Sequence, residues 1–190
     1  MAEEAGQVRR EELDGEAAAR RRTALAQIRQ YPDPVLRLPA REVETFDDDL
    51  RRLIGRMTRL LEDSHGVGLA GNQVGVLQRV ALVQPSADED PVALVNPRIV
   101  ERSDEVSTDE EGCLSMQGVL VPVERHCSVT VEARDGDGEE IRIELQGLGA
   151  RVAQHELDHL DGTLILDRTS ADGRREALGT LRPRPVVVVS

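Results

Sequence analysis

Aromatic side chains are almost absent from this sequence. Tyr31 and Phe46 are the only two, and there is no tryptophan. Hydrophobic residues still make up 39% of the 190 residues, which is normal for a globular protein and argues against disorder over the whole chain. A chain of this length can bury one substantial core in a single domain. We therefore expect one domain whose core is built from Leu, Val, Ile and Ala.

Positive charge is also scarce. The sequence contains no lysine, and 36 acidic residues outnumber 24 basic ones, so the formal net charge is −12. An acidic chain is repelled by phosphate backbones and by anionic lipids. We therefore expect neither nucleic-acid specificity nor binding to a membrane.

Long hydrophobic runs and cysteines are few as well. No stretch approaches the roughly 20 apolar residues that span a bilayer, and the first residues, MAEEAGQVRR, lack the apolar core of a secretory signal. These features predict a cytoplasmic protein. In that reducing compartment we expect no disulfide between Cys113 and Cys127, the only two cysteines.

Composition divides the chain into three parts. Residues 1–22 mix Glu, Arg and Ala with few larger apolar residues, which predicts a charged extension that is either an exposed helix or disordered. Residues 23–170 contain the predicted strands and both strong helices, and should form the domain. Residues 171–190 form a C-terminal tail, whose last residues, RPRPVVVVS, cannot be helical through their prolines.

The order of the predicted elements favours an α+β fold. Apolar residues recur at helical spacing over residues 48–63, and a second helix is predicted over about 148–160. Alternating apolar residues and short apolar runs predict strands, and DGDG at 135–138 predicts a hairpin turn. The predicted strands cover residues 77–84, 92–100, 119–123, 129–133 and 141–145. We expect antiparallel strands packed around one central helix, the one at 148–160.

The central helix carries a metal-binding pattern, His-Glu-x-x-His, within QHELDH. His155 and His159 are four residues apart, so both imidazoles project from one face of the helix and can hold one ion. Their face includes Leu148 and Val152, which directs the ligands toward the core. Glu156 can place a carboxylate near a metal-bound water as proton acceptor and donor. The alternative is a pair of ordinary histidines on a helix.

A third ligand is expected because a catalytic tetrahedral site has three protein ligands and keeps one position for water. Cys113 is the candidate, in the polar segment EEGCLS, which is typical of a turn. A thiolate donates negative charge to an ion, and the ion keeps the thiol deprotonated. A cysteine nucleophile with a histidine base would not explain two histidines at ligand spacing. His65 and His126 receive no chemical role.

A glycine-rich segment, GVGLAGNQ at residues 66–73, is too rich in glycine for regular structure. A phosphate-binding loop would need a following lysine or a dinucleotide-binding context. Small residues instead let a substrate backbone approach closely, and Gln73 offers a neutral amide donor.

Together these segments resemble the peptide deformylases. The family motifs G-x-G-x-A-A-x-Q, E-G-C-x-S and H-E-x-D-H occur here in the same order, as GVGLAGNQ, EGCLS and HELDH. The resemblance extends over about residues 28–168, and it makes residues 23–170 a deformylase-like catalytic domain. It implies a metal-dependent hydrolase that removes the N-formyl group from the N-terminal methionine of new peptides and releases formate. It implies Fe2+ as the ion, with Zn2+ or another divalent ion able to occupy the site, and N-formylmethionyl peptides as partners, met at the ribosome.

The resemblance also assigns roles to individual residues. It implies that Cys113, His155 and His159 bind the ion. The catalytic residues would be Glu156, which moves the proton, and the two donors to the developing oxyanion, Gln73 and the backbone N–H of Leu114. The residues that would bind substrate are Val67, Gly68, Leu148 and Val152. Asp158 would steady the helix or a ligand, and Arg125 would pair with Glu111.

Two departures from the family pattern leave the substrate open. Gly71 stands where alanine is usual, and Met116-Gln117-Gly118 replaces an aliphatic residue, proline and glycine. Either change could alter the peptide preference, so one alternative is a deformylase-like hydrolase for a different N-formyl or N-acyl substrate. A non-catalytic structural metal site is a third alternative, but it gives Glu156 and Gln73 no reason to accompany three ligands.

Overall fold

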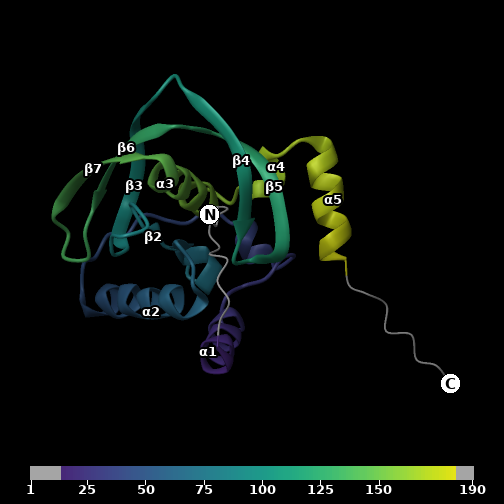
Figure 1. The fold of residues 1–190 in the computed structure, drawn as a ribbon. Coiled ribbons are helices and arrows are strands. Elements are labelled where there is room, and N and C mark those ends of the chain that lie inside the picture. Colours follow the sequence, from purple (N-terminus) through teal and green to yellow (C-terminus); the bar gives the residue numbers. More distant parts are fainter. Residues whose placement is uncertain (1–13, 183–190) are drawn as a thin grey trace.

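The computed structural model describes residues 14–182 and has the expected α+β fold. A five-stranded antiparallel sheet and a two-stranded antiparallel sheet lie on either side of helix α3 (Figure 1). The order of the larger sheet is β1-β2-β3-β6-β7, with β1 Gly68–Ala70, β2 Val80–Val83, β3 Val92–Arg102, β6 Ser128–Arg134 and β7 Glu140–Gln146. The smaller sheet pairs β4 Val106–Cys113 with β5 Met116–His126. The helical elements are α1 Gly15–Leu25, η1 Pro34–Arg37, α2 Asp48–Ser64, η2 Gly71–Val74, α3 Gly147–Leu160, α4 Ile165–Arg168 and α5 Ala171–Leu181.

Helix α2 forms where its apolar spacing predicts. The Asp47 carboxylate accepts hydrogen bonds from two backbone N–H groups of the first turn and so caps the helix. Its buried face, with Leu50, Met57, Leu60 and Leu61, packs in one cluster with residues of β1 and β2. The helix ends at Ser64, and the next residue, His65, adopts a left-handed conformation with φ of 55°.

Helix α3 is the central element, buried almost along its whole length. Apolar residues such as Val152 and Ala153 pack against the larger sheet. Half of its buried residues are polar or charged. Such groups are buried at a high energetic cost unless they have hydrogen-bond partners or bind an ion. The sequence of α3 therefore concentrates polar chemistry in the centre of the fold.

Two segments differ from their predicted structure. Cys113 was expected in a turn, but it is the last residue of β4, and the turn begins only at Leu114. The outer part of β4 is acidic and exposed, so it lacks the apolar alternation that marks a strand. The glycine-rich segment was expected to be irregular, yet it contains the short strand β1 and the 3-10 helix η2.

The two ends of the described chain are helical. In α1, Ala24 and Leu25 are buried in the same cluster as the buried face of α2. Helix α5 occupies residues 171–181 of the predicted tail and packs beside β5 (Figure 1). Residues 1–13 of the predicted extension and 183–190 of the tail lie outside the described residues.

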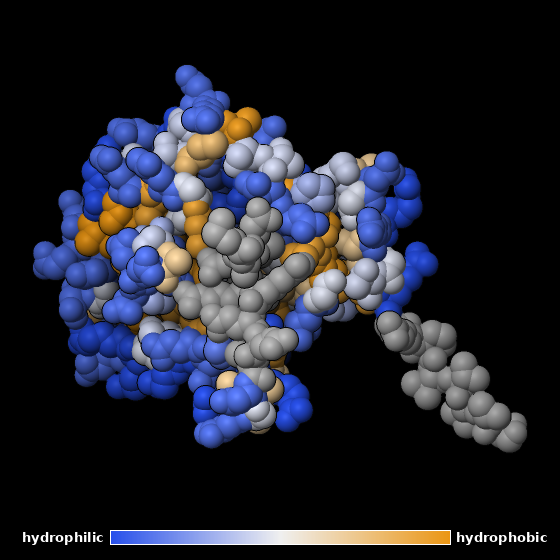
Figure 2. All heavy atoms as spheres, viewed as in Figure 1, coloured by the Kyte–Doolittle hydropathy of each residue, from blue (hydrophilic) through white to orange (hydrophobic). Residues whose placement is uncertain are grey.

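The surface is largely hydrophilic on the face that Figure 2 shows, as the 32% content of charged residues predicts. Among the helices of residues 14–182, none combines the length and the apolar character needed to cross a membrane.

Candidate metal centre and active site

The structure brings the three predicted ligands together. Cys113 ends β4, while His155 and His159 lie one turn apart on α3, and all three side chains are buried. One potential ligand atom from each residue lies within 4.8 Å of the others. The Cys113 Sγ is 3.3 Å from the His159 Nε2. The strand end and the helix therefore meet at a single point.

These three residues fit a divalent ion. The His155 Nε2 is buried and has no hydrogen-bond partner among the described residues, so an ion would satisfy an atom that is otherwise costly to bury. A thiolate and two imidazoles are the soft and borderline donors that zinc and ferrous iron accept. With three protein ligands, a fourth position remains for water or substrate.

Glu111 sets the orientation of the His155 ring. Its Oε2 accepts a hydrogen bond of 3.0 Å from the His155 Nδ1, which leaves the Nε2 directed to the ligand cluster. The same carboxylate accepts from Arg125 Nε at 2.9 Å and from Arg151 Nη1 at 2.9 Å. Burial raises the pKa of Glu111, but the hydrogen bonds from His155 and Arg125 outweigh it and hold that pKa well below its usual range. Glu111 is therefore ionised, and the predicted Arg125–Glu111 pair is present.

The pKa values of the two histidines are shifted in opposite directions. Burial lowers the pKa of His155, but the Cys113 thiol and the Glu111 carboxylate beside its ring raise it more strongly, to about 10. Burial and the nearby positive charge of His155 lower the pKa of His159 well below its usual value. With no ion bound, a proton on His155 would balance the negative groups around it. A bound ion would supply that positive charge and release the proton.

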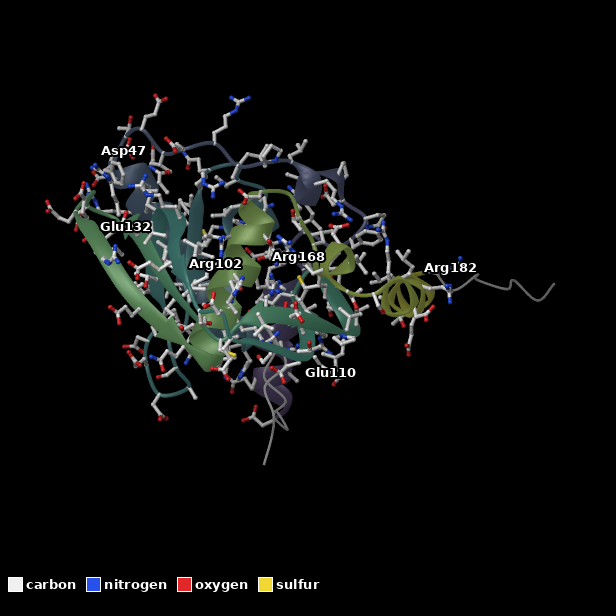
Figure 3. All side chains as sticks on the ribbon, turned by 90° about the horizontal axis from the view of Figure 1, so that it is seen from above. Asp47, Arg102, Glu110, Glu132, Arg168 and Arg182 are labelled. Carbon is white, nitrogen blue, oxygen red and sulfur yellow. The ribbon has the colours of Figure 1, made fainter. Side chains whose placement is uncertain are left out.

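Asp158 continues this network through Arg125. It accepts from Arg125 Nη1 at 2.6 Å and from Arg168 Nε at 3.0 Å. Arg168 comes from α4 and lies beside α3 near the middle of the view in Figure 3. Asp158 thus links α3 to both β5 and α4.

Glu156 lies against the glycine-rich segment. Its side chain is fully buried. A Cβ atom built on Gly68 would lie 2.2 Å from the Glu156 Oε1 and 2.6 Å from the Val152 Cγ1. No real Cβ approaches so closely, so the absence of a side chain at Gly68 makes the space that the carboxylate occupies.

Gly68→Ala should therefore displace Glu156, the predicted catalytic carboxylate, and lower kcat by about 10²-fold, the scale expected for a displacement of about 1 Å. Gly68 does not have a positive φ, so alanine is allowed by the backbone and any loss would come from the added methyl group. Gly55→Ala is the matched control, because its nearest atom is 3.8 Å away, on the Arg59 side chain. Steady-state kinetics of both variants would check this, and a Gly68→Ala enzyme as active as Gly55→Ala would show that Glu156 has room to move.

Gln73 presents its amide to the ligand cluster. Its Oε1 accepts from the Ala70 N–H at 2.9 Å, which fixes the direction of the amide. Its Nε2 then lies 3.1 Å from the Ser115 Oγ and 3.7 Å from the Cys113 Sγ. Leu114 is buried between these two residues in the turn after β4. The two predicted oxyanion donors are thus neighbours of one ligand.

The predicted substrate residues share one hydrophobic cluster. Val67 and Val152 are fully buried in it, and Leu148 packs against it while remaining partly exposed. Gly68 adjoins this cluster through Val152. The four residues therefore form an apolar wall, which reaches Glu156 at Gly68 and Val152.

Gly71 faces the backbone of residues 76–80. A Cβ at Gly71 would lie 2.7 Å from the Gln78 carbonyl oxygen and 2.9 Å from that of Val76. Glycine at position 71 allows the backbone of residues 76–80 to pack closely against it, so the departure from alanine directly affects this packing. Gln117, the other departure, does line a cavity beside Cys113.

Three polar residues of the site were missed by sequence reasoning. Arg151 binds Glu111, Ser115 accepts from Gln73, and the Asn72 Nδ2 donates to the His159 carbonyl. Arg151 had a usable signal, because it precedes His155 by one helical turn and so shares its buried face. Ser115 is the last residue of the motif E-G-C-x-S, which marks its position but not its contact with Gln73, and Asn72, in the 3-10 helix η2, offers no such signal.

Most of the chain is similar to known proteins of one family. Residues 25–175 match the model of the polypeptide deformylase family. The peptide deformylase of Desulforudis audaxviator is 42% identical over 80% of this chain and 99% of that protein. The crystal structure of peptide deformylase from Thermotoga maritima is 44% identical with a TM-score of 0.72, covering 75% of this chain and 96% of that one. The structure of peptide deformylase 1B from Arabidopsis thaliana with an inhibitor is 38% identical with a TM-score of 0.77, covering 82% and 89%.

The matched region contains all three predicted ligands, and it begins at Leu25, so most of α1 precedes it. The resemblance inferred from the three sequence motifs is confirmed.

Proposed function

Because this chain belongs to the polypeptide deformylase family and is an enzyme that removes N-formyl groups, we propose that Cys113, His155 and His159 hold its catalytic ion. The observation that carries this proposal is the convergence of the three buried ligand atoms within 4.8 Å. When bound, a divalent ion lowers the pKa of a water molecule and polarises a carbonyl group. We further propose Fe2+ as the physiological ion, with Zn2+ able to replace it, since the ligand set suits both.

Glu156 is proposed to move the proton. Hydrolysis forms a C–O bond to the formyl carbon and breaks its C–N bond, so a proton must pass from the attacking water to the leaving amine. Glu156 is the residue after the proposed ligand His155 on α3, and its carboxylate occupies the space left by the missing side chain of Gly68. It can accept the proton first and donate it to the amine afterwards, which gives formate and a free N-terminus.

Gln73 and the backbone N–H of Leu114 are proposed to stabilise the negative charge that develops on the formyl oxygen. Donors held in place before reaction contribute most, because no reorganisation is needed in the transition state. The bond from Ala70 to the Gln73 Oε1 supplies this fixed orientation.

The substrate is proposed to lie along β1. This strand is at the edge of the five-stranded sheet, so its outer side can pair with an extended peptide. Gly68 would lie beside the substrate backbone, and the wall of Val67, Leu148 and Val152 would take an unbranched side chain such as methionine. We propose that these peptides are newly made N-formylmethionyl chains, met in the cytoplasm at the ribosome.

The iron-loaded protein should hydrolyse formyl-Met-Ala-Ser and leave acetyl-Met-Ala-Ser nearly untouched. A formyl carbon carries only hydrogen, whereas an acetyl methyl group must fit beside Gln73 and Cys113, which are 3.7 Å apart at their nearest polar atoms. Initial rates of formate and acetate release, measured anaerobically, would check this. Equal rates for both peptides would contradict the proposed selectivity.

A different N-formyl or N-acyl substrate is the second candidate. It is favoured by Gln117, which lines the cavity beside Cys113 in place of the usual family sequence. Turnover of another formamide without turnover of formyl-Met-Ala-Ser would support it.

A further inference from the structure

A cavity of about 340 Å³ lies between α1 and the beginning of β5. Arg21 and Leu25 of α1 form one side, and Cys113, Leu114 and residues 116–120 form the other. Figure 1 shows α1 near the turn that joins β4 to β5. Because Cys113 is a proposed metal ligand and Leu114 a proposed oxyanion donor, the cavity borders the catalytic centre. A peptide that reaches the ion can therefore place a later side chain in this cavity.

Arg21 gives the cavity its charge. Among the described residues that line it, Arg21 is the only one with a formal charge when the Cys113 thiolate is bound to the ion. The Arg21 Nε donates to the Ser64 carbonyl at 3.1 Å, at the C-terminal end of α2. Neither Nη atom has an acceptor among the described residues. The guanidinium is thus anchored through one nitrogen and keeps two for a ligand.

The helix that carries Arg21 is fixed to the domain. The Asp14 carboxylate caps its first turn by accepting from the Ala17 N–H at 2.8 Å. Leu25 is 6% exposed and packs in the core cluster shared with α2. Arg21 is therefore presented by a packed element, at a defined position relative to Cys113.

We propose that Arg21 determines substrate preference by binding an acidic side chain of the formyl peptide, one or two residues after the methionine. This inference rests on the proposed function. A carboxylate suits the site because a guanidinium with two free nitrogens can bind it in a bidentate manner. The volume accommodates one side chain beside the peptide backbone. A neutral side chain would gain less there, and a lysine would be repelled.

The test uses full-length, iron-loaded protein and amidated peptides, so that only the varied side chain carries a charge. The series is formyl-Met-Xaa-Ala amide and formyl-Met-Ala-Xaa amide, with Glu, Gln or Lys as Xaa. In at least one series, kcat/KM should be about two- to fivefold higher for Glu than for Gln, the effect of a partly exposed ion pair. The kcat/KM of the Lys peptide should be lower than that of the Gln peptide. The difference should lie in KM, since the contact exists equally before and during reaction.

Variants of Arg21 should remove or reverse this preference. Arg21→Gln should make the Glu and Gln peptides equal, and Arg21→Glu should favour Lys over Glu. Arg22→Gln is the matched control, because it removes the same charge from an exposed neighbour on the same helix. The control should keep the wild-type preference. At about 1 M salt, where the Debye length is about 3 Å, the wild-type preference should shrink.

A second readout does not depend on turnover. The deformylated product peptides Met-Glu-Ala amide and Met-Lys-Ala amide, or the corresponding Met-Ala-Xaa pair, should bind with different Kd values in calorimetry. That difference should disappear in Arg21→Gln.

The outcomes separate this inference from the proposed function. Turnover of formyl-Met-Ala-Ser with identical Glu, Gln and Lys values in wild type would overturn the role of Arg21 and leave the deformylase assignment intact. An equal loss for every peptide in Arg21→Gln, with a lowered Tm, would mean that Arg21 only anchors α1 to α2. Absence of all formyl-peptide turnover by the iron-loaded wild type would contradict both the proposed function and the role of Arg21.

Discussion

Glu156→Ala is expected to lower kcat by about 10²–10⁴-fold, the usual contribution of a general acid–base group. The residue is buried beside Gly68 and Val152, and its carboxylate fills the space that glycine leaves. Its neighbour His155 is a proposed ligand, but Glu156 is not part of the ligand cluster. The variant should therefore keep its ion and its fold while losing the proton transfer. Glu156→Gln, which keeps the shape and removes the base, should lose activity to a similar extent.

Elemental analysis of the purified proteins separates this loss from a loss of metal. Wild type and both Glu156 variants should contain about one divalent ion per chain, whereas Cys113→Ala and His159→Ala should contain much less, because each removes one of three ligands. Near-normal kcat in Glu156→Ala would exclude the residue from the mechanism. An unchanged metal content in both ligand variants would exclude the metal site itself.

The helices could be predicted because their signals are local. Helix α2 has an Asp cap and apolar residues at helical spacing, and it runs over Asp48–Ser64 where residues 48–63 were expected. Helix α3 runs over Gly147–Leu160 where 148–160 was expected. The His-Glu-x-x-His spacing on that helix then fixes the relative position of two ligands without any knowledge of the rest of the fold.

Strand β4 could not be predicted, because its stability comes from a partner. Its residues Asp109 and Glu110 are exposed and acidic, and only its last three residues are buried. It is a strand because it pairs with β5 in an antiparallel register, with Glu111 opposite Val121. Pairing between strands depends on contacts with a partner strand, and the strand propensities of single residues carry no information about those contacts.

The partners of the ligands were partly accessible from the sequence. The motif E-G-C contains Glu111, but its contacts with Arg151 and His155 join β4 to a helix some 40 residues later. The position of Arg21 beside the cavity was not accessible either, because the composition of residues 1–22 predicts only an extension that is an exposed helix or disordered. Long-range packing decides which charges of this highly charged chain enter the site.

Glu111→Gln is expected to lower the free energy of unfolding by about 3–5 kcal/mol, the cost of leaving buried charges unpaired. The carboxylate is fully buried and accepts from Arg125, Arg151 and His155. A neutral amide has one oxygen for these three donors and adds an N–H₂ group that faces cations. Chemical denaturation in the presence of a chelator would measure the change without a contribution from metal binding.

Glu101→Gln is the matched control, because Glu101 pairs with Arg142 at 2.7 Å but is 65% exposed. Such a surface pair should contribute at most about 1 kcal/mol. Equal losses of unfolding free energy in the two variants would show that the buried contacts of Glu111 stabilise the fold no more than a surface ion pair does.

The pH dependence gives this prediction a second test. The pKa of Glu111 is lower in the folded protein than its ordinary value of 4.5, so its ionised form stabilises the fold. That stabilisation is complete above the unfolded pKa and is lost as the pH falls below it, toward the lower pKa of the folded state. The pKa of His155 is raised partly by Glu111, so the stabilisation from this pair is also lost as the pH rises above the ordinary histidine value of 6.5 toward about 10. The gap between wild type and Glu111→Gln should therefore be largest between about pH 5 and 6.5 and should narrow at lower pH. A gap that stays constant down to about pH 3 would mean that the loss comes from altered packing around the amide, since a packing defect does not titrate.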